Sequence, residues 1–322
     1  MKAVVLTGSG VEIRDVPQPR VKPSEVLVRN RACALNRADL QMVSGRRHGA
    51  MGGAGAIAGM EFAGEVVEVG AEAQGCKPGD RVMCGGAAAF AEFAVADYGR
   101  TLPLPAGMSF ETGATLPVAL NTLHDALLTQ GRLQSGQTVL IQGASTGVGL
   151  MGLQIAKMKG ARLVIGTSTS AEKRGRLKDF GADIVLDPKD PSWVDEVLAA
   201  TDGAGVDVLI DMVSGYVANQ NLLATRVLGR IVNIGRLGGF KGEFDFDLHA
   251  MKRIHYIGAS FRTRSIEEIR EINRLMRADL WDAVAQGKLK VPIDRSFRLD
   301  EIHAAVAHAK ANAHFGKIVL TV

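Results

Sequence analysis

A glycine-rich turn between a buried strand and an amphipathic helix constrains this chain more than any other feature. The turn reads QGASTGVG at 142–149, between a strand expected at 138–142 and a helix expected at 148–159. Its glycines permit close backbone approach, and the free N–H groups of the helix's first turn attract negative charge. The arrangement predicts a pyrophosphate site. The alternative is a turn with a purely structural role.

The chain around this turn alternates strands with helices from about residue 116, which is typical of a parallel sheet covered on both faces. The strands are expected at 138–142, 162–166, 184–186, 206–211, 230–234 and 256–260, and two of the helices at 148–159 and 171–180. Six strands is the number found in a doubly wound dinucleotide-binding domain. This part of the chain is therefore expected to be a Rossmann-type domain of the α/β class.

The first part of the chain has short strand-like runs broken by Gly and Pro, which indicates a β-rich barrel or sandwich. Its strands are expected at 2–6, 25–34, 64–69, 80–83 and 91–95, and a glycine-rich loop at 45–59. After a helix at 266–286, the tail has a helix at 299–311 and a strand at 317–322. We expect the tail to complete the first domain, which divides the chain into 1–118, 119–261 and 262–322.

Charge and cysteine usage narrow the class of protein. Lys and Arg outnumber Asp and Glu by 38 to 34 and are scattered, so we expect no nucleic-acid partner. The three cysteines, Cys33, Cys76 and Cys84, have no CxxC spacing, which favours a reducing compartment. No signal peptide or apolar stretch of membrane-spanning length is apparent. The sequence thus predicts a soluble cytoplasmic protein without a membrane partner.

The end of the second strand of the nucleotide-binding domain favours one dinucleotide over the other. Its sequence is GTSTSAEKR at 166–174, without a carboxylate at the strand end to bind the ribose hydroxyls of NADH. Hydroxyl groups followed by Lys173 and Arg174 are suited to the 2'-phosphate of NADPH. The alternative is that Ser168 or Ser170 merely caps the next helix, which is compatible with phosphate binding. We expect NADPH as the cofactor.

Further segments resemble a known family. CALNRADL at 33–40 and GMEFAG at 59–64, together with the glycine turn, resemble the medium-chain dehydrogenase/reductase superfamily, specifically its quinone oxidoreductase branch. The similarity continues through DMVSG at 211–215, GRIVNIG at 229–235 and GKIVL at 316–320. The resemblance implies a GroES-like β-rich catalytic domain into which the Rossmann-type, doubly wound parallel sheet domain is inserted.

The resemblance also bears on metal binding. In zinc-dependent relatives, a cysteine, a histidine and a second cysteine or an acid hold a catalytic zinc. The matching positions here are Asn36, Met60 and about Val118, whose side chains do not form a zinc site. Glu61 alone is no site, and the seven histidines have no ligand spacing. We predict that the protein binds no metal.

Without zinc, the simplest reaction is hydride delivery to a quinone or enone that delocalises the incoming charge itself. The resemblance places Asn36 near the nicotinamide ribose and the acceptor, which makes it the first catalytic candidate. Asp39 is the second, although organising the local turn or pairing with an arginine is its favoured role. Many quinone reductases have a tyrosine in the following loop, whereas GRRHG stands at 45–49 here. Arg47 or His48 is a candidate to stabilise an enolate or to contact an anionic substrate. The alternative is that both are ordinary exposed loop residues.

The expected cofactor-binding residues come from two sources. The turn and the strand end provide Gly143, Ser145, Thr146, Gly147, Val148, Ser168 and Lys173. The resemblance adds Asn36, Asn121, Thr122, Gly235, Arg236, Leu237, Phe261, Arg262, Thr263 and Asn312. Each of the residues in the second group has plain packing as its alternative role.

Two other functions are compatible with these residues. One is an enoyl-thioester reductase acting on acyl carrier protein or coenzyme A substrates, for which a basic channel would be diagnostic. The other is a weakly catalytic NADPH-binding protein with a structural or RNA-binding role. The strand expected at 256–260 would lie at a sheet edge that relatives commonly pair across a two-fold axis, so we expect a homodimer.

Overall fold

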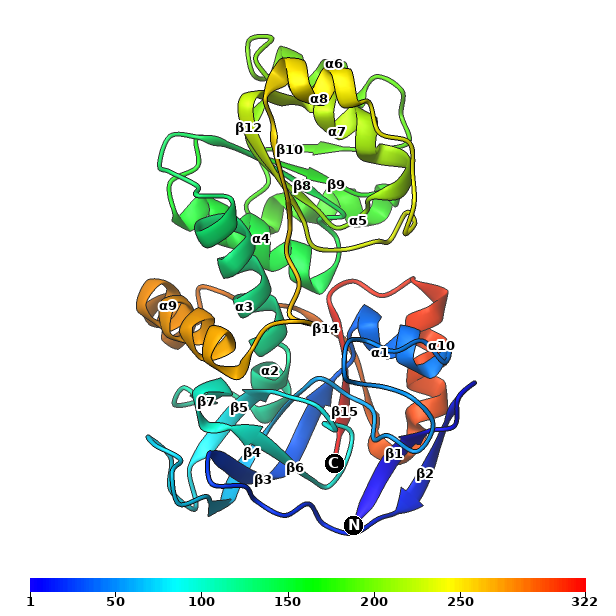
Figure 1. Ribbon diagram of the computed structural model, residues 1–322, viewed down its shortest axis with the longest axis vertical. Helices are drawn as coiled ribbons and strands as arrows, with labels where there is room; N and C mark the ends of the chain where they lie inside the picture. The colour runs from blue at the N-terminus through cyan, green and yellow to red at the C-terminus, as the bar shows by residue number, and fades with distance from the viewer. The chain divides into compact units, whose positions relative to one another are not determined.

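The computed structural model describes residues 1–322, which form two compact units (Figure 1). Unit 1 consists of Met1–Val118 and Phe261–Val322, and unit 2 of Ala119–Ser260. The division expected from the sequence differs from this grouping by one residue, because it assigned Phe261 to the nucleotide-binding domain.

Unit 2 contains a six-stranded parallel sheet. Its strands are β8 (Thr138–Gln142), β9 (Leu163–Thr167), β10 (Ile184–Leu186), β11 (Val206–Asp211), β12 (Thr225–Asn233) and β13 (His255–Gly258). They lie in the order β10-β9-β8-β11-β12-β13. Numbered within the unit this order is 3-2-1-4-5-6, the order of the doubly wound dinucleotide-binding sheet. The predicted six-stranded Rossmann-type sheet is confirmed.

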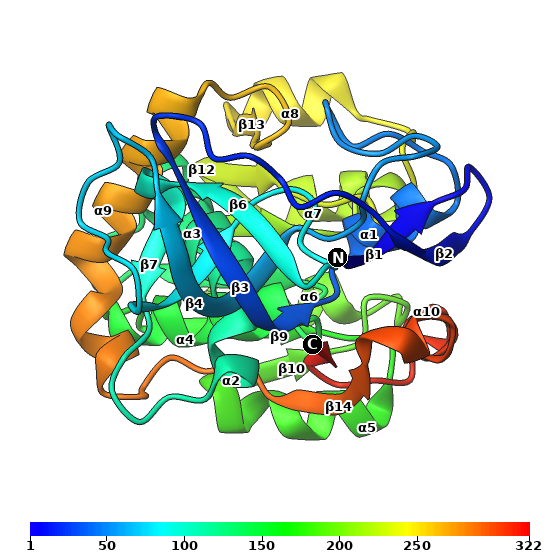
Figure 2. The ribbon, with the colours of Figure 1, turned by 90° about the horizontal axis from the view of Figure 1, so that it is seen from below.

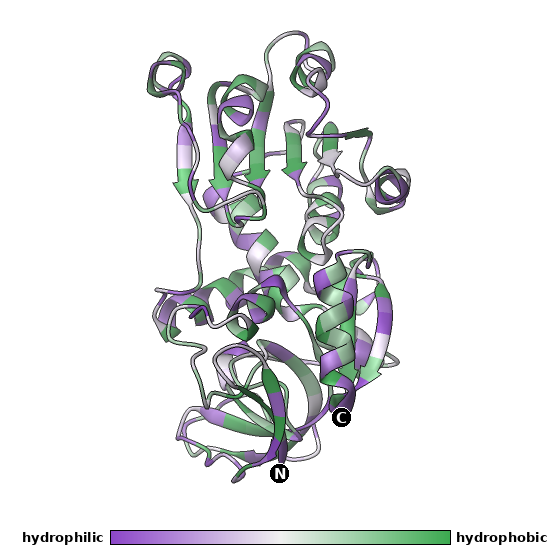
Figure 3. Cartoon of the chain, turned by 90° about the vertical axis from the view of Figure 1, so that its right-hand side faces the viewer, coloured by the Kyte–Doolittle hydropathy of each residue, from purple (hydrophilic) through white to green (hydrophobic).

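Helical segments precede β8 and connect the later strands of this sheet. They are α3 (Pro117–His124), the π-helix η2 (Asp125–Gln130), α4 (Gly147–Met158), α5 (Ala171–Arg176), the 3-10 helix η3 (Leu177–Phe180), α6 (Trp193–Ala199), the 3-10 helix η4 (Gly215–Val217), α7 (Ala218–Ala224) and α8 (Phe246–Lys252). The helix expected at 171–180 is thus divided into α5 and η3. Hydrophobic residues predominate in the strands of the sheet (Figure 3), as expected for strands buried on both faces.

The core of unit 2 explains this pattern. Leu140, Ile165, Leu209 and Ile231 come from four adjacent strands and pack in one cluster with Trp193 of α6. All five side chains are at most 1% exposed. The sheet's position is therefore fixed by apolar burial, and the loops at the ends of its strands are held on a rigid support.

Unit 1 is built on a seven-stranded sheet and a hairpin. The sheet strands are β3 (Glu25–Ala34), β4 (Glu61–Val69), β5 (Arg81–Gly85), β6 (Phe93–Asp97), β7 (Thr101–Pro103), β14 (Ile293–Arg298) and β15 (Lys317–Thr321), and the hairpin strands are β1 (Lys2–Leu6) and β2 (Val11–Asp15). The order is β14-β15-β3-β4-β5-β7, with β6 also paired to β3. Figure 2 shows β3, β4 and β6 side by side.

The C-terminal tail completes this sheet, as predicted. Strand β15 pairs antiparallel with β3, with Val319 opposite Ala34 and Leu320 opposite Cys33. The remaining elements of unit 1 are α1 (Arg37–Val43), the 3-10 helix η1 (Tyr98–Arg100), α2 (Phe110–Ala114), α9 (Ile266–Ala285), the 3-10 helix η5 (Leu299–Glu301) and α10 (Ile302–Ala311). None of the helices in the structure has the length and hydropathy needed to cross a membrane.

Candidate functional site

The glycine turn lies where β8 ends and α4 begins. Gly143 has φ +78°, a left-handed conformation that favours glycine, and its N–H donates to Thr167 Oγ1 at 3.0 Å. A Cβ atom added to Gly149 would lie 2.7 Å from the Cα of Ala144. Both glycines are therefore required by the local backbone, and the turn holds the start of α4 close to the strand.

The first turn of α4 offers donors to an anion. Thr146 caps the helix by accepting a hydrogen bond from the N–H of Gly149 at 3.0 Å. The backbone N–H groups of Gly147 and Val148 have no acceptor within the chain. Since such groups carry the positive end of the helix dipole, the turn is suited to bind a pyrophosphate. These residues therefore fit the nucleotide that the sequence predicts.

Hydroxyl groups line the end of β9, next to the glycine turn. Thr167 Oγ1 donates to Gln142 Oε1 at 2.7 Å, and the hydroxyl oxygens of Ser145 and Ser168 lie 2.9 Å apart. Ser170 caps α5 by accepting from the N–H of Lys173 at 3.3 Å. The structure thus brings Ser145 and Ser168 together, and no carboxylate stands among residues 166–170.

Arg174, the other cation near the end of β9, has partners within the chain. Its Nη1 donates to the carbonyl of Ser168 at 2.7 Å and to Asp187 Oδ2 at 2.8 Å. Asp187 directly follows β10, the neighbour of β9 in the sheet. Arg174 therefore ties two adjacent strand ends together.

The loops after β11 and β12 complete this edge of the sheet. Asp211 is fully buried, and its Oδ1 accepts from the N–H groups of Val213 and Ser214, both at 2.8 Å. Burial raises the pKa of this carboxyl, although those hydrogen bonds act in the opposite direction. Ser214 Oγ donates to the carbonyl of Gly235 at 2.7 Å, which joins the two loops.

The predicted residues Gly235, Arg236 and Leu237 lie in the second of these loops. A Cβ on Gly235 would lie 2.5 Å from the carbonyl oxygen of Met212, so the loops approach too closely for a side chain. A Cβ on Gly143 would lie 3.6 Å from Leu237 Cδ1. The structure therefore gathers three loops at the carboxyl ends of β8, β11 and β12, where open α/β sheets bind ligands. Asn121 and Thr122 lie on α3; Asn121 is buried and Thr122 half-buried.

In unit 1, Asn36 belongs to a buried polar network. It caps α1, and its N–H donates to Asp39 Oδ2 at 2.7 Å. Its side-chain Nδ2 donates to Glu61 Oε1 at 2.9 Å, while its Oδ1 accepts from Lys317 Nζ at 2.6 Å. Both ends of the amide are thus engaged, and the orientation of the Asn36 side chain is fixed.

Glu61 and Lys317 are the central residues of this network. Lys317 Nζ also donates to Glu61 Oε1, and Glu61 Oε2 accepts from the N–H of Val118 at 2.9 Å. The two side chains are 4% and 0% exposed for Lys317 and Glu61. This pair was not predicted from the sequence. Its only signal was a charged residue in each of two otherwise apolar segments, GMEFAG and GKIVL.

This network does not fit a zinc ion. The Asn36 amide is hydrogen-bonded to Lys317 and Glu61. Met60 has a thioether side chain and Val118 an alkyl side chain. The carboxylate of Glu61 already accepts a hydrogen bond from the ammonium group of Lys317. No group of three His, Cys, Asp or Glu side chains in the structure is arranged to hold a metal ion. Tetrahedral zinc sites in proteins are built from thiolate, imidazole or carboxylate ligands.

Asp39 is 1% exposed and lies next to this network. Burial raises the pKa of its carboxyl to about 7, although the N–H of Asn36 and the charge of Lys317 act in the opposite direction. The favoured structural role of Asp39, organising the turn, agrees with its hydrogen bond to Asn36.

The other predicted residues of unit 1 are on its surface or at its loops. Arg47 is exposed and donates to the carbonyl of Ala50 at 3.4 Å. Arg262 packs against the same loop, because a Cβ on Gly49 would lie 2.8 Å from its carbonyl oxygen. Phe261 and Thr263 flank Arg262 in the segment before α9. Asn312 ends α10 with φ 55° and accepts from Arg37 Nη2 at 2.7 Å.

Two protein-family models match the chain, one mostly in unit 1 and the other mostly in unit 2. Residues 22–106 match the alcohol dehydrogenase GroES-like domain, and residues 147–278 match the zinc-binding dehydrogenase domain. The rat quinone oxidoreductase is 30% identical over 314 residues, which cover 95% of this chain and 92% of that protein.

Polyketide synthases are also similar. A phenolphthiocerol/phthiocerol polyketide synthase of Mycobacterium tuberculosis is 29% identical over 97% of this chain. The chain spans 14% of the length of that protein. It matches one segment of a much longer polypeptide.

Solved structures have the same fold over the full chain. Mycobacterial Rv1454c complexed with NADPH has a TM-score of 0.89 and 27% identity, covering 100% of both chains. The CurK enoyl reductase has a TM-score of 0.87 and 25% identity, covering 99% of this chain and 98% of that one.

Proposed function

Because the chain belongs to the quinone oxidoreductase branch of the medium-chain dehydrogenase/reductase superfamily, we propose that it reduces quinones or other α,β-unsaturated carbonyl compounds with NADPH. The observation that carries this proposal is the strand-turn-helix at 138–158, with free N–H groups at Gly147 and Val148. The similarity to mycobacterial Rv1454c complexed with NADPH supports it.

The preference for NADPH over NADH rests on the end of β9. The hydroxyl groups of Ser145 and Ser168 lie together there, and Lys173 is the nearby cation. A 2'-phosphate would receive hydrogen bonds and positive charge from these groups. The free ribose hydroxyl of NADH would find no carboxylate at this position.

When bound, NADPH supplies a hydride from C4 of its nicotinamide ring. A quinone or enone spreads the incoming charge over its own conjugated system, so the protein needs mainly to hold and orient the reactants. Asn36 is our candidate for contacts to the nicotinamide ribose or the acceptor, and Lys317 and Glu61 are positioning residues that fix its amide. We propose that this reaction proceeds without zinc.

A second candidate function is reduction of an enoyl thioester. The similarity to the CurK enoyl reductase and to a polyketide synthase favours it. Such a substrate carries a phosphopantetheine arm, whose phosphate would be attracted by basic groups such as Arg47 and Arg262 on the adjoining loops of unit 1.

We also propose that the protein forms a homodimer through β13, which is the edge strand of the sheet in unit 2. An unpaired strand edge presents free backbone groups that a second copy can pair with. Sedimentation at micromolar concentration tests this, and a monomer alone would refute it.

An acceptor series tests the proposed reaction. NADPH oxidation is followed by absorbance with 1,4-benzoquinone, 9,10-phenanthrenequinone, a simple enone and crotonyl coenzyme A as acceptors. Turnover with the first three and not with the thioester supports the leading function. Turnover confined to the thioester favours the second, and tight NADPH binding without turnover on any acceptor would indicate a binding protein.

A further inference from the structure

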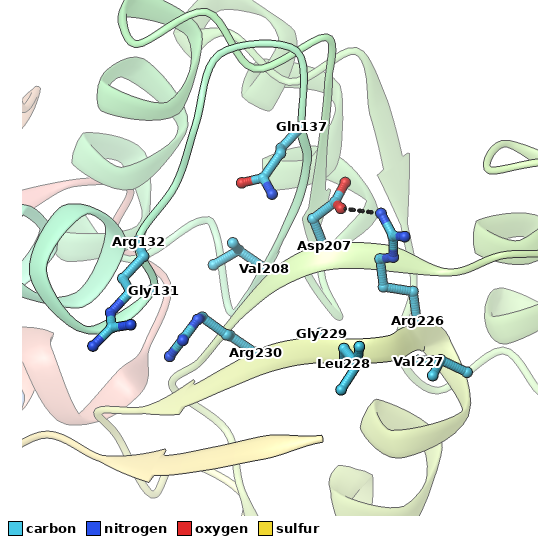
Figure 4. A pocket seen from close by; sticks show the side chains of 10 residues that line it. All are labelled: Gly131, Arg132, Gln137, Asp207, Val208, Arg226, Val227, Leu228, Gly229 and Arg230. Carbon is cyan, nitrogen blue, oxygen red and sulfur yellow. Dashed lines mark hydrogen bonds and ion pairs between the residues drawn. The ribbon is translucent and has the colours of Figure 1, made fainter. Parts of the chain in front are cut away.

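An open surface cavity of about 250 Å³ lies in unit 2, away from the glycine turn. Figure 4 shows the residues that line it, which include Gln137 just before β8, Asp207 at the start of β11, and Arg226 to Arg230 at the start of β12. The sheet is parallel, with Val208 beside both Val139 and Arg230. The cavity is therefore at the amino ends of the strands, whereas the glycine turn is at the carboxyl end.

The charge of this cavity is positive and only partly compensated. Its lining has three arginines, Arg132, Arg226 and Arg230, and one carboxylate, Asp207. Asp207 Oδ1 accepts from Arg226 at 2.6 Å, and its Oδ2 accepts from the N–H and the hydroxyl of Thr138, both at 2.8 Å. The Asp207 carboxylate is thus paired with Arg226 and hydrogen-bonded to Thr138.

Arg132 and Arg230 form no ion pair. Arg230 Nη1 donates only to the carbonyl of Gln130, at 3.3 Å. Both side chains line the cavity, and Figure 4 draws their guanidinium groups near one another. Partial burial and the like charge of Arg132 lower the pKa of Arg230. Two adjacent cations without a carboxylate repel one another, and an anion between them would relieve that repulsion.

The backbone on both sides of the cavity is held in an unfavourable conformation. Arg132 has φ 50° and Leu228 has φ 61°, and neither is a glycine. Leu228 lies where the register of β12 against β11 shifts, between the pairs Val206–Thr225 and Val208–Arg230. Left-handed conformations are strained for non-glycine residues, and such strain is often found at ligand-binding sites. The backbone that positions Arg132 and Arg230 is therefore strained at Arg132 itself and at Leu228.

We propose that this cavity binds an oxyanion, a phosphate or a carboxylate group, between Arg132 and Arg230. Arginine matches such groups because its planar guanidinium donates two parallel hydrogen bonds to two oxygens. The site lies at the opposite end of the sheet from the glycine turn and is independent of the proposed reaction.

The test is calorimetric titration with inorganic phosphate and, in a second series, with citrate, at constant ionic strength. It compares the wild type with Arg132→Gln, Arg230→Gln and the control Arg253→Gln. Arg253 is a matched control, since it is an exposed arginine of unit 2 with φ 51° that does not line the cavity.

We expect saturable binding that each cavity substitution weakens about tenfold or more, as loss of a charge-assisted hydrogen bond implies, and that Arg253→Gln leaves unchanged. Phosphate bound at the glycine turn would give the same heat in all four proteins, so only the arginine-dependent part is counted. Arg132→Lys and Arg230→Lys keep the charge if a glutamine variant fails to fold, and should weaken binding less.

The two series separate the possible ligands. Arginine-dependent binding of phosphate alone identifies a phosphate site, and arginine-dependent binding of citrate alone identifies a carboxylate site. Equal titration curves for the wild type and all variants with both anions would overturn the proposal.

Discussion

Lys317 Nζ donates a hydrogen bond to Glu61 Oε1 in the interior of unit 1, and the two side chains are 4% and 0% exposed. Lys317 comes from the last strand of the chain and Glu61 from the start of β4. The pair orients the Asn36 amide, because Lys317 donates to its oxygen and Glu61 accepts from its nitrogen. A buried ion pair of unit 1 thus fixes the orientation of the candidate catalytic residue Asn36.

Breaking this ion pair should destabilise the protein strongly. Lys317→Met leaves the carboxylate of Glu61 buried without its cation, which is expected to lower the free energy of unfolding by about 3–5 kcal/mol. The double variant Lys317→Met/Glu61→Gln removes both charges and should recover most of the loss. Urea unfolding measures both. A single variant as stable as the wild type would show that the pair is not buried as described.

Substitution of Asn36 should reduce turnover more than stability. Asn36→Ala removes the amide that Lys317 and Glu61 orient, so kcat should fall roughly 10–100-fold if this group positions the reactants. The KM for NADPH should change less. Steady-state kinetics separates the two constants, and an unchanged kcat would remove Asn36 from the proposed machinery.

Lys173 should discriminate between the two dinucleotides. Lys173→Gln removes a cation from the end of β9 and should raise the KM for NADPH about tenfold, as loss of one charge-assisted contact to phosphate implies. The KM for NADH should stay the same. Lys178→Gln, at an exposed position on η3, is the matched control. Equal effects of Lys173→Gln on both cofactors would contradict the 2'-phosphate assignment.

Gly149 should not tolerate a side chain. In Gly149→Ala the new Cβ would lie 2.7 Å from the Cα of Ala144, so the turn must move and NADPH binding should weaken at least tenfold. Gly175→Ala is the control, because a Cβ there meets nothing within 4 Å and alanine favours the helix by up to about 1 kcal/mol. Fluorescence titration with NADPH compares the two, and similar affinities would argue against a nucleotide at this turn.

Asp39 should give the stability a pH dependence. Burial raises its pKa to about 7 from an ordinary value of 3.8, so the folded protein binds more protons than the unfolded chain between these values. The contribution of Asp39 to the free energy of unfolding therefore falls as the pH rises from about 4 to about 7. Asp39→Asn removes this titration. Urea unfolding of both proteins at several pH values should show their stabilities diverging over that interval, and parallel curves would refute the assignment.

Local patterns allowed much of the nucleotide-binding domain to be predicted from the sequence. The bounds predicted for β8 from its apolar run and from the glycine turn that follows are the observed ones. Both signals are local, since they lie within a dozen residues of each other. Strand β12 was expected to start at residue 230 and starts at Thr225, since Arg226, Val227 and Leu228 are exposed and the register is irregular there. Exposed β residues have no periodic apolar pattern to predict them.

Polar contacts between residues far apart in the chain could not be predicted from the sequence. Lys317 and Glu61 are 256 residues apart, and neither position indicates its partner. Arg174 follows a run of hydroxyl residues, which suggested phosphate binding, and its observed partner Asp187 comes from the end of the neighbouring strand. Charged side chains are satisfied by whichever partner the fold brings near, and spacing along the chain does not identify that partner.

The most direct test of the account is the ratio of kcat/KM for NADPH to that for NADH, measured with a quinone acceptor after exhaustive treatment with a metal chelator. The account predicts a ratio well above one and full activity after chelation, because hydroxyl groups and Lys173 replace the carboxylate at the end of β9, and the Asn36 amide and the Glu61 carboxylate are already bound by Lys317. A preference for NADH, or activity lost on chelation and restored by zinc, would contradict it.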